Sequence, residues 1–230
     1  MRTDDFMAFY GDIATGDVQY GHRVEMCDTI KAHLGESQST IFQEVVAAQV
    51  AAGNPPEGYA SGPGFKLNNV TIDVNDSGRQ WNYQVCTEYG WFQTPSQIHP
   101  MRSELINTQY WINFCSRVFE GLDMTGKPAA WQTTVDQGGF NIGGTNIFFT
   151  NGSEDPWQWA TQRETRPELN QVSRTSTCAH CGHCAELYTP LPTDAPELVE
   201  TREMIADWVA EMLRVYIPPD PIEQPMMFLQ

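Results

Sequence analysis

Basic residues are scarce in this sequence. Its 230 residues include 13 Lys and Arg against 29 Asp and Glu, which gives a formal net charge of −16. So acidic a chain repels nucleic-acid phosphates and anionic membrane surfaces, and both are therefore excluded as partners. The sequence also lacks any run of about 18 apolar residues, the minimum for a membrane-spanning helix. The acidity suits a protein that works at low pH, or it serves solubility alone.

A signal peptide is also missing from these residues, because the N-terminus has neither a long apolar core nor a small-residue cleavage site. Three glycosylation sequons are nevertheless present, at Asn69, Asn75 and Asn151. Six cysteines add to the impression of an oxidising compartment. We expect a secretory-pathway protein, lysosomal, vacuolar or extracellular, whose N-terminal portion is not included.

The first part of the chain has a helical pattern. Apolar residues recur at helical spacing over residues 4–34 (with a break near Gly16 and Gly21), over 40–52 and over 107–119. Between the second and third stretches, residues 58–78 are rich in Gly, Asn, Asp and Ser, and they predict a surface loop with a short strand at 70–74.

An aromatic segment, residues 81–94, carries Glu88 as its single charge. It is either a buried structural element or one wall of an apolar substrate pocket. On the second interpretation Glu88, Tyr89 and Trp91 line the pocket together with Trp157.

A change of pattern near residue 137 suggests a domain boundary, between residues 1–136 and 137–230. A Gly-rich passage leads into a strand at 146–150, and a short helix is expected at 157–163. A second strand follows at 172–175, and a long amphipathic helix is expected after it, with Asp194 as its N-cap.

Each of these two strands leads into a turn with a catalytic residue type. Asp155 follows the first strand, and His183 follows the second. In α/β-hydrolases the triad residues occur in the order Ser, Asp, His, and the last two lie on loops after late strands. The carboxylate orients the imidazole, which takes the proton of the nucleophile. His180 is an alternative base one turn earlier.

Cys178, Cys181 and Cys184 alternate with these histidines. Two Cys-x-x-Cys steps with His could bind zinc. A closed zinc site, however, usually takes ligands from two separate segments, and no second cluster of Cys and His occurs in the sequence. In a secreted protein the same cysteines would instead form disulfides, or one disulfide with an odd thiol.

Several motifs together resemble one peptidase family. They are Val18-Gln-Tyr-Gly21, Trp81-Asn-Tyr-Gln-Val-Cys-Thr-Glu-Tyr-Gly90, Asn151-Gly-Ser-Glu-Asp-Pro-Trp157 and His183-Cys-Ala-Glu-Leu187. The chain resembles the C-terminal half of the lysosomal Pro-X carboxypeptidase and dipeptidyl-peptidase II family, which includes thymus-specific serine protease. Glu186 stands where family members often have Asp.

The resemblance implies an α/β-hydrolase domain with an inserted, mostly helical cap. Residues 1–136 would be the later part of the cap, and 137–230 the closing portion of the hydrolase domain, with an incomplete central sheet. It implies Asp155 and His183 as acid and base, a Cys86–Cys115 disulfide, and a partner for Cys27 outside these residues. It implies a peptide substrate with proline near one terminus, and neither a cofactor nor a metal. A homodimer is left open.

The nucleophile motif Gly-x-Ser-x-Gly does not occur in the 230 residues. Without the nucleophilic serine of that motif the acid–base pair has nothing to activate. We therefore expect this polypeptide alone to be inactive and poorly stable. Three interpretations follow. The chain is part of a serine exopeptidase, of carboxypeptidase or dipeptidyl-peptidase type, or it is a non-catalytic binding or regulatory remnant, or it is a small metal-binding domain built on the cysteine cluster.

Overall fold

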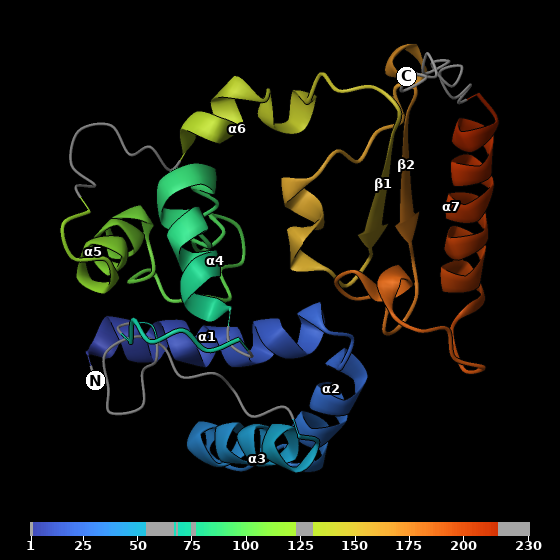
Figure 1. Ribbon diagram of the computed structural model, residues 1–230. Coiled ribbons are helices and arrows are strands. Elements are labelled where there is room, and N and C mark those ends of the chain that lie inside the picture. Colours follow the sequence, from blue (N-terminus) through green and yellow to red (C-terminus); the bar gives the residue numbers. More distant parts are fainter. Residues whose placement is uncertain (1, 54–66, 68, 75–76, 123–130, 216–230) are drawn as a thin grey trace, which may run out of the picture.

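A computed structural model describes residues 2–53, 67, 69–74, 77–122 and 131–215. Its α-helices are α1 (Thr3–Gln19), α2 (Arg23–Ala32), α3 (Gln38–Ala51), α4 (Gly78–Gln84), α5 (Thr108–Val118), α6 (Gln132–Asp136) and α7 (Pro196–Val215). A π-helix spans Val85–Tyr89, and 3-10 helices span Gly139–Asn141, Pro156–Ala160, Pro167–Leu169 and Ala185–Leu187. The strands are β1 (Ile147–Gly152) and β2 (Gln171–Ser176). Figure 1 shows helices α4 and α5 on the left of the molecule, α3 at the bottom, and β1, β2 and α7 on the right.

The helices predicted in the first part of the chain are confirmed, and local polar groups set their ends. The Ser37 hydroxyl accepts the Thr40 N–H at 3.2 Å, and the Asn107 side chain accepts the Tyr110 N–H at 3.1 Å. Each satisfies a donor that the first turn of a helix leaves unpaired. The predicted break falls at Gly21, whose positive φ of 82° ends α1 and turns the chain into α2.

A cluster of buried hydrophobic residues lies in the helical part of the described chain. It is formed by Ala8, Cys86, Ile106, Tyr110, Trp111, Phe114, Cys115, Val118 and Phe119. Most of these side chains come from one face of α5, and the aromatic rings of Trp111 and Phe114 lie 5.4 Å apart edge to face. A disulfide joins Cys86 to Cys115 inside the cluster, with an S–S distance of 2.02 Å. This is the pairing that the family resemblance implied.

The two strands form a parallel pair, in register from Ile147 opposite Gln171 to Gly152 opposite Ser176. Both predicted strands are therefore confirmed, each somewhat longer than expected. Helix α7 packs beside them, and its Trp208 meets Phe148 of β1 with ring centroids 6.0 Å apart. Parallel strands joined by a crossover and covered by helices are the basic unit of α/β folds.

Three local expectations were wrong. The segment 70–74 is not a strand: Val70, Ile72 and Val74 are 77%, 86% and 91% exposed, and no described strand pairs with them. The expected helix 157–163 is a shorter 3-10 helix that begins at Pro156. Asp194 does not cap α7, because its carboxylate accepts the Leu191 N–H at 2.9 Å and binds Arg202 instead.

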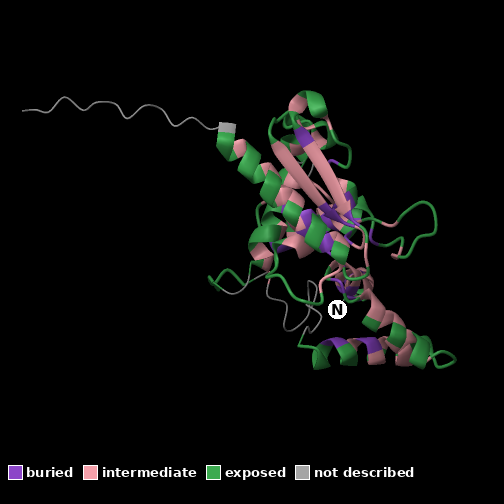
Figure 2. Ribbon diagram, turned by 90° about the vertical axis from the view of Figure 1, so that its right-hand side faces the viewer, coloured by how far each residue is buried: buried purple, intermediate pink, exposed green. Residues whose placement is uncertain are grey.

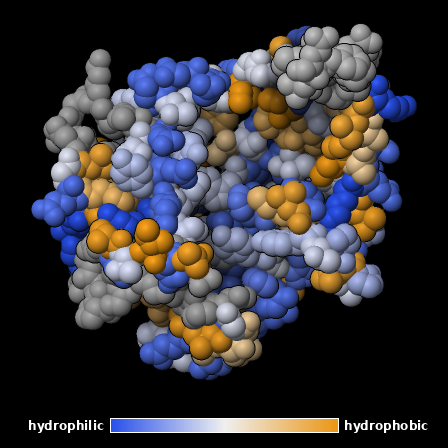
Figure 3. Space-filling model, in the orientation of Figure 1, coloured by the Kyte–Doolittle hydropathy of each residue, from blue (hydrophilic) through white to orange (hydrophobic). Residues whose placement is uncertain are grey.

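Burial in the sheet is uneven. Figure 2 shows the strands mostly in the intermediate class. In β1 the buried residues are Asn151 and Gly152, and in β2 they are the terminal residues Gln171 and Ser176. The face drawn in Figure 3 shows hydrophobic residues in several separate patches rather than one continuous surface. The sheet is thus most enclosed where β1 and β2 run into the Asp155 and His183 turns.

No helix within the described residues, the 20-residue α7 included, is long and apolar enough to cross a membrane.

Candidate catalytic acid–base pair

Asp155 is fixed by the turn that follows β1. Its backbone N–H donates to the Gly152 carbonyl at 3.1 Å, and its Oδ1 accepts the Trp157 N–H at 2.8 Å. Pro156 suits the first helical position because it has no N–H to leave unpaired. The Asp155 side chain is only 9% exposed. One carboxylate oxygen is thus held by backbone, and Oδ2 remains for another partner.

That partner is His183. Its Nδ1 lies 2.8 Å from Asp155 Oδ2. An ionised carboxylate only accepts hydrogen bonds, so Nδ1 carries the proton and donates it. The proton-accepting nitrogen of the neutral ring is therefore Nε2, and the His183 side chain is 37% exposed. This is the geometry of an imidazole oriented by a carboxylate to act as a general base.

The pKa of His183 is raised above its ordinary value of 6.5. The main cause is the hydrogen bond to Asp155, which favours the protonated ring; partial burial opposes it, and the negative charges of Asp155 and Glu186 reinforce it. The surroundings therefore stabilise the imidazolium that forms when the ring takes a proton.

Backbone contacts hold the two turns together. The Glu154 N–H donates to the Cys181 carbonyl at 3.0 Å, and the Ser153 N–H donates to the Ser176 carbonyl at 2.9 Å. The His183 N–H donates to the carbonyl of Gln19, the last residue of α1, at 2.6 Å. The Asp turn, the His turn and the end of α1 thus form one connected frame.

Two glycines allow this close approach. A Cβ atom added to Gly152 would lie 2.3 Å from the Cys181 carbonyl oxygen, and one added to Gly182 would lie 2.4 Å from the Gln19 carbonyl oxygen. Both distances are far below van der Waals contact, and both involve backbone that cannot rotate away. Any larger residue would push the frame apart.

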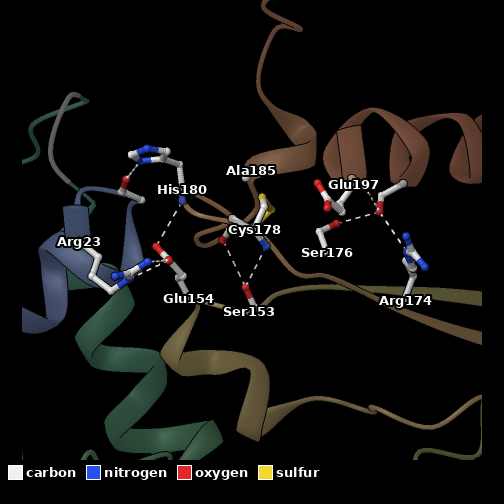
Figure 4. Close-up of a disulfide and its surroundings, with 12 residues drawn as sticks. Arg23, Ser153, Glu154, Arg174, Ser176, Cys178, His180, Ala185 and Glu197 are labelled. Atoms are coloured by element: carbon white, nitrogen blue, oxygen red, sulfur yellow. Dashed lines mark hydrogen bonds and ion pairs between the residues drawn. A yellow bond between two sulfur atoms is a disulfide. The ribbon is translucent and has the colours of Figure 1, made fainter. Parts of the chain in front are cut away.

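His180 does not compete for Asp155. Its ring Nδ1 lies 2.5 Å from the Gly21 carbonyl, and its backbone N–H donates to Glu154 at 3.3 Å. Figure 4 shows Arg23 of α2 reaching the same Glu154 carboxylate, which it contacts at 2.6 Å. The structure therefore pairs His183, not His180, with Asp155, and it uses His180 to join the His turn to the start of α2.

The cysteines beside the pair are divided between a disulfide and a thiol. Cys178 and Cys181 form a disulfide, and Cys184 is free and half-buried. Burial is the main cause that raises the pKa of the Cys184 thiol, and nearby carboxylates add to it. The zinc interpretation would need the two sulfurs that the disulfide already uses. No group of three metal-binding side chains occurs among the described residues.

Only part of the predicted aromatic pocket comes together. Trp157 and Tyr89 both contact Trp81, each with ring centroids 5.9 Å apart, whereas Trp91 packs on Phe140. Trp81, which the sequence analysis did not select, therefore links the aromatic segment to the residue two positions after Asp155. Glu88 lies on the same π-helix as Tyr89 and is exposed.

The sequons differ in accessibility. Asn151 is 5% exposed and its side-chain nitrogen, where a glycan would be attached, is buried without a partner in the described part of the chain. The folded structure thus does not offer Asn151 for glycosylation, contrary to the expectation. Asn69 is exposed, and its side chain accepts the Thr71 N–H at 3.0 Å. Asn75 lies outside the described residues.

Three residues whose contacts lie beside the two turns were not predicted from the sequence. Gln19 and Gly182 carry no chemical signature of their own, and their only signal was that each lies within or beside a motif of the family. Arg202 on α7 gave no signal, because helix patterns show which residues face inward and not which carbonyls they reach.

Comparison with known proteins finds several serine proteases that are similar to parts of this chain. A probable serine protease of Arabidopsis thaliana is 36% identical over 121 residues, which cover 53% of this chain and 24% of that protein. Thymus-specific serine protease of Mus musculus is 28% identical over 150 residues, 65% of this chain and 29% of that protein. A probable extracellular serine carboxypeptidase of Arthroderma benhamiae is 34% identical over 92 residues.

The chain therefore spans about a quarter of the length of the first two relatives. The pattern of the serine carboxypeptidase S28 family matches residues 11–205, which include both Asp155 and His183. With most of its length covered by that match, the chain belongs to the serine carboxypeptidase S28 family.

Proposed function

We propose that Asp155 and His183 are the acid and the base of a serine-type exopeptidase that cleaves peptides next to proline. The observation that carries this proposal is the 2.8 Å contact between Asp155 Oδ2 and His183 Nδ1, formed by the turns that follow two parallel strands. Membership of a serine carboxypeptidase family supports the reaction class. The preference for proline rests on the resemblance described above.

In this reaction His183 Nε2 takes the proton of the serine hydroxyl and later gives it to the leaving amine. Asp155 keeps the ring in the tautomer that this requires and stabilises the imidazolium. The raised pKa of His183 fits that role, because it reflects the same hydrogen bond. The ring is partly exposed, so Nε2 can meet a group that approaches from outside the Asp turn.

The serine itself is placed outside these residues. Gly-x-Ser-x-Gly does not occur in the 230 residues, so on this proposal the nucleophile and the oxyanion hole come from another part of the protein. Residues 1–136 then belong to a helical cap and 137–230 to the hydrolase domain. The polypeptide alone is inactive. The protein works in the secretory pathway, lysosomal, vacuolar or extracellular.

Glu88 is proposed to bind the free amine of a peptide, which would make the enzyme a dipeptidyl-peptidase rather than a carboxypeptidase. It is exposed, it lies next to Tyr89, and Tyr89 reaches Trp157 through Trp81. The test is charge reversal. E88K should raise KM for a dipeptide reporter with a free N-terminus, and E104K, at another exposed site, should not. Equal effects would remove this role from Glu88.

The main experiment starts from the transcript. Sequencing it in full shows whether a Gly-x-Ser-x-Gly motif is encoded in frame before residue 1. The protein so defined should label with a fluorophosphonate and cleave a Pro-containing reporter. D155N should lower kcat by about 10⁴-fold and H183A by about 10⁶-fold. The 230-residue chain should do neither. Labelling of that shorter chain would contradict the proposed position of the serine.

A non-catalytic role is the second candidate, and the absence of the nucleophile motif favours it. A transcript without Gly-x-Ser-x-Gly would support it. The chain would then act through binding, with the Trp81, Tyr89 and Trp157 rings as its aromatic surface. In that case Trp81→Ala would weaken peptide binding, while D155N and H183A would leave it unchanged.

A further inference from the structure

Arg202, on α7, contacts the segment that follows His183. Its Nε–H donates to the Glu186 carbonyl at 3.0 Å. Its Nη2 donates to the Ala185 carbonyl at 3.1 Å and to the Tyr188 carbonyl at 3.4 Å. A single side chain therefore binds three backbone carbonyls of the 3-10 helix Ala185–Leu187 and the residue after it.

A guanidinium suits this task. Its donors lie in one plane on a rigid fork, whereas a lysine offers one compact ammonium. The fourth contact of Arg202, from Nη1, is an ion pair with Asp194 at 2.5 Å. Three of its four contacts are thus to backbone carbonyls and one is to a charged side chain. We therefore refer to Arg202 as a clamp, because its main contacts fix the backbone of a loop.

The base of this clamp is itself fixed. Thr201, the residue before Arg202, is fully buried, and its hydroxyl lies 2.7 Å from that of Ser176 at the end of β2. The Arg202 side chain is 17% exposed. The contact between Thr201 and Ser176 thus fixes the backbone of Arg202 next to the end of β2, which leads into the His turn. From there the guanidinium binds the residues just after that turn.

His183 lies between two fixed points. Before the ring position, its own N–H is held by the Gln19 carbonyl at 2.6 Å. After it, Cys184 takes a positive φ of 54° and leads directly into the segment that Arg202 holds. The Gln19 contact alone would fix only the start of the turn. If the residues after Cys184 moved, the His183 ring would move with them.

We propose that Arg202 is a positioning residue for His183, holding the Ala185–Tyr188 carbonyls so that the imidazole stays beside Asp155. The importance of this for catalysis rests on the proposed function. Arg202 acts through the loop, without contact to substrate or to the ring.

The test compares two variants of the 230-residue chain. One removes the carbonyl contacts of Arg202, and the other weakens its ion pair with Asp194. R202K keeps the positive charge and the partner for Asp194 but cannot hold three carbonyls. D194N weakens the ion pair and leaves the carbonyl contacts. In histidine-labelled protein, the NMR pH titration of His183 should move toward 6.5 in R202K and stay at the wild-type position in D194N.

The downfield Nδ1 proton of His183 should also be lost in R202K alone. R202Q adds a check on sign: removing a nearby positive charge by itself would raise the pKa of His183, so a fall reports loss of the Asp155 contact. R214Q is the matched control, since Arg214 lies on the same helix and, within the described residues, its side chain binds only Glu211. It should change nothing.

An unchanged His183 titration in folded R202K would overturn the proposal. Global unfolding of R202K, seen as lost chemical-shift dispersion, would overturn it too, because Arg202 would then support the whole fold. In a full-length active protein, R202K should lower kcat by about 100-fold with KM unchanged. If the NMR effect is present and the full-length protein cleaves no peptide, the positioning role stands and the proposed function falls.

Discussion

The backbone N–H of His183 donates to the carbonyl of Gln19 at 2.6 Å, so the turn that carries His183 contacts the last residue of α1. The same Gln19 accepts the indole N–H of Trp157 through its side chain at 3.2 Å. One residue from the helical part therefore contacts both the turn that carries His183 and Trp157, two positions after Asp155. The site depends on both parts of the chain.

Replacing Gly182 should disturb this junction. In G182A the new Cβ would lie 2.4 Å from the Gln19 carbonyl oxygen, and relief of that clash should cost about 1–3 kcal/mol of stability. Urea unfolding measures the loss. In G16A, where nothing lies within 4 Å of the new Cβ, the helix should instead gain up to about 1 kcal/mol. Equal effects of the two changes would show that the close contact at Gly182 does not matter.

The Asp155–His183 hydrogen bond should make stability depend on pH. The pKa of His183 is higher in the folded chain than its ordinary 6.5, so the folded state holds the proton more tightly. The resulting stabilisation is complete below the unfolded pKa, and it is lost as the pH rises through the folded pKa. The free energy of unfolding should therefore fall as the pH rises from about 6.5 through the raised pKa of His183 in the folded chain.

D155N should flatten that pH dependence, because an amide keeps the acceptor for the Trp157 N–H but not the charge. Urea titrations at several pH values check it. D136N is the control, since Asp136 is exposed and bonds only the Gln132 side chain among the described residues. A D155N curve parallel to wild type would show that the hydrogen bond does not stabilise the folded chain.

The two disulfides should differ in their effect on stability. Cys86 and Cys115 are 29 residues apart in sequence, so their bond removes much freedom from the unfolded chain, about 3–4 kcal/mol. Cys178 and Cys181 are 3 apart, and the same reasoning gives about 2 kcal/mol or less. The midpoints of urea unfolding of C86A/C115A and C178A/C181A should follow this order. The reverse order would show that the His turn depends on its disulfide more than the α5 core does.

Glycosylation should follow exposure rather than the sequon. When the chain is directed into a eukaryotic secretory pathway by an added leader, Asn69 should carry a glycan and Asn151 should not. Removal of the glycans with a glycosidase and peptide mass analysis measure the occupancy of each site. N69Q should lose a glycan, and N151Q should migrate as wild type. A glycan on Asn151 in folded protein would contradict its burial at 5% exposure.

The sequence predicted those features that depend on local pattern. Periodicity identified the helices of the first part and both strands, and the two strand–turn units gave Asp155 and His183. It failed where a distant contact decides. Val70–Val74 has a strand-like alternation but pairs with no described strand, and the Asn151 sequon says nothing of burial. Gln19 and Arg202 support the His turn through backbone carbonyls, which no residue pattern reveals.

The frame around Gly152 and Gly182 also has a consequence for the order of folding. Trp157 and Gln19 meet although 138 positions separate them, and the His183 contact to Gln19 closes an even longer loop. Contacts so distant form late, after local helices exist, because the entropy of the intervening chain must be lost first. The contacts of Gln19 with Trp157 and His183 are thus made at the end of folding. A partly folded chain could already have the Asp155–His183 contact, which joins residues 28 positions apart, before Gln19 fixes the His turn.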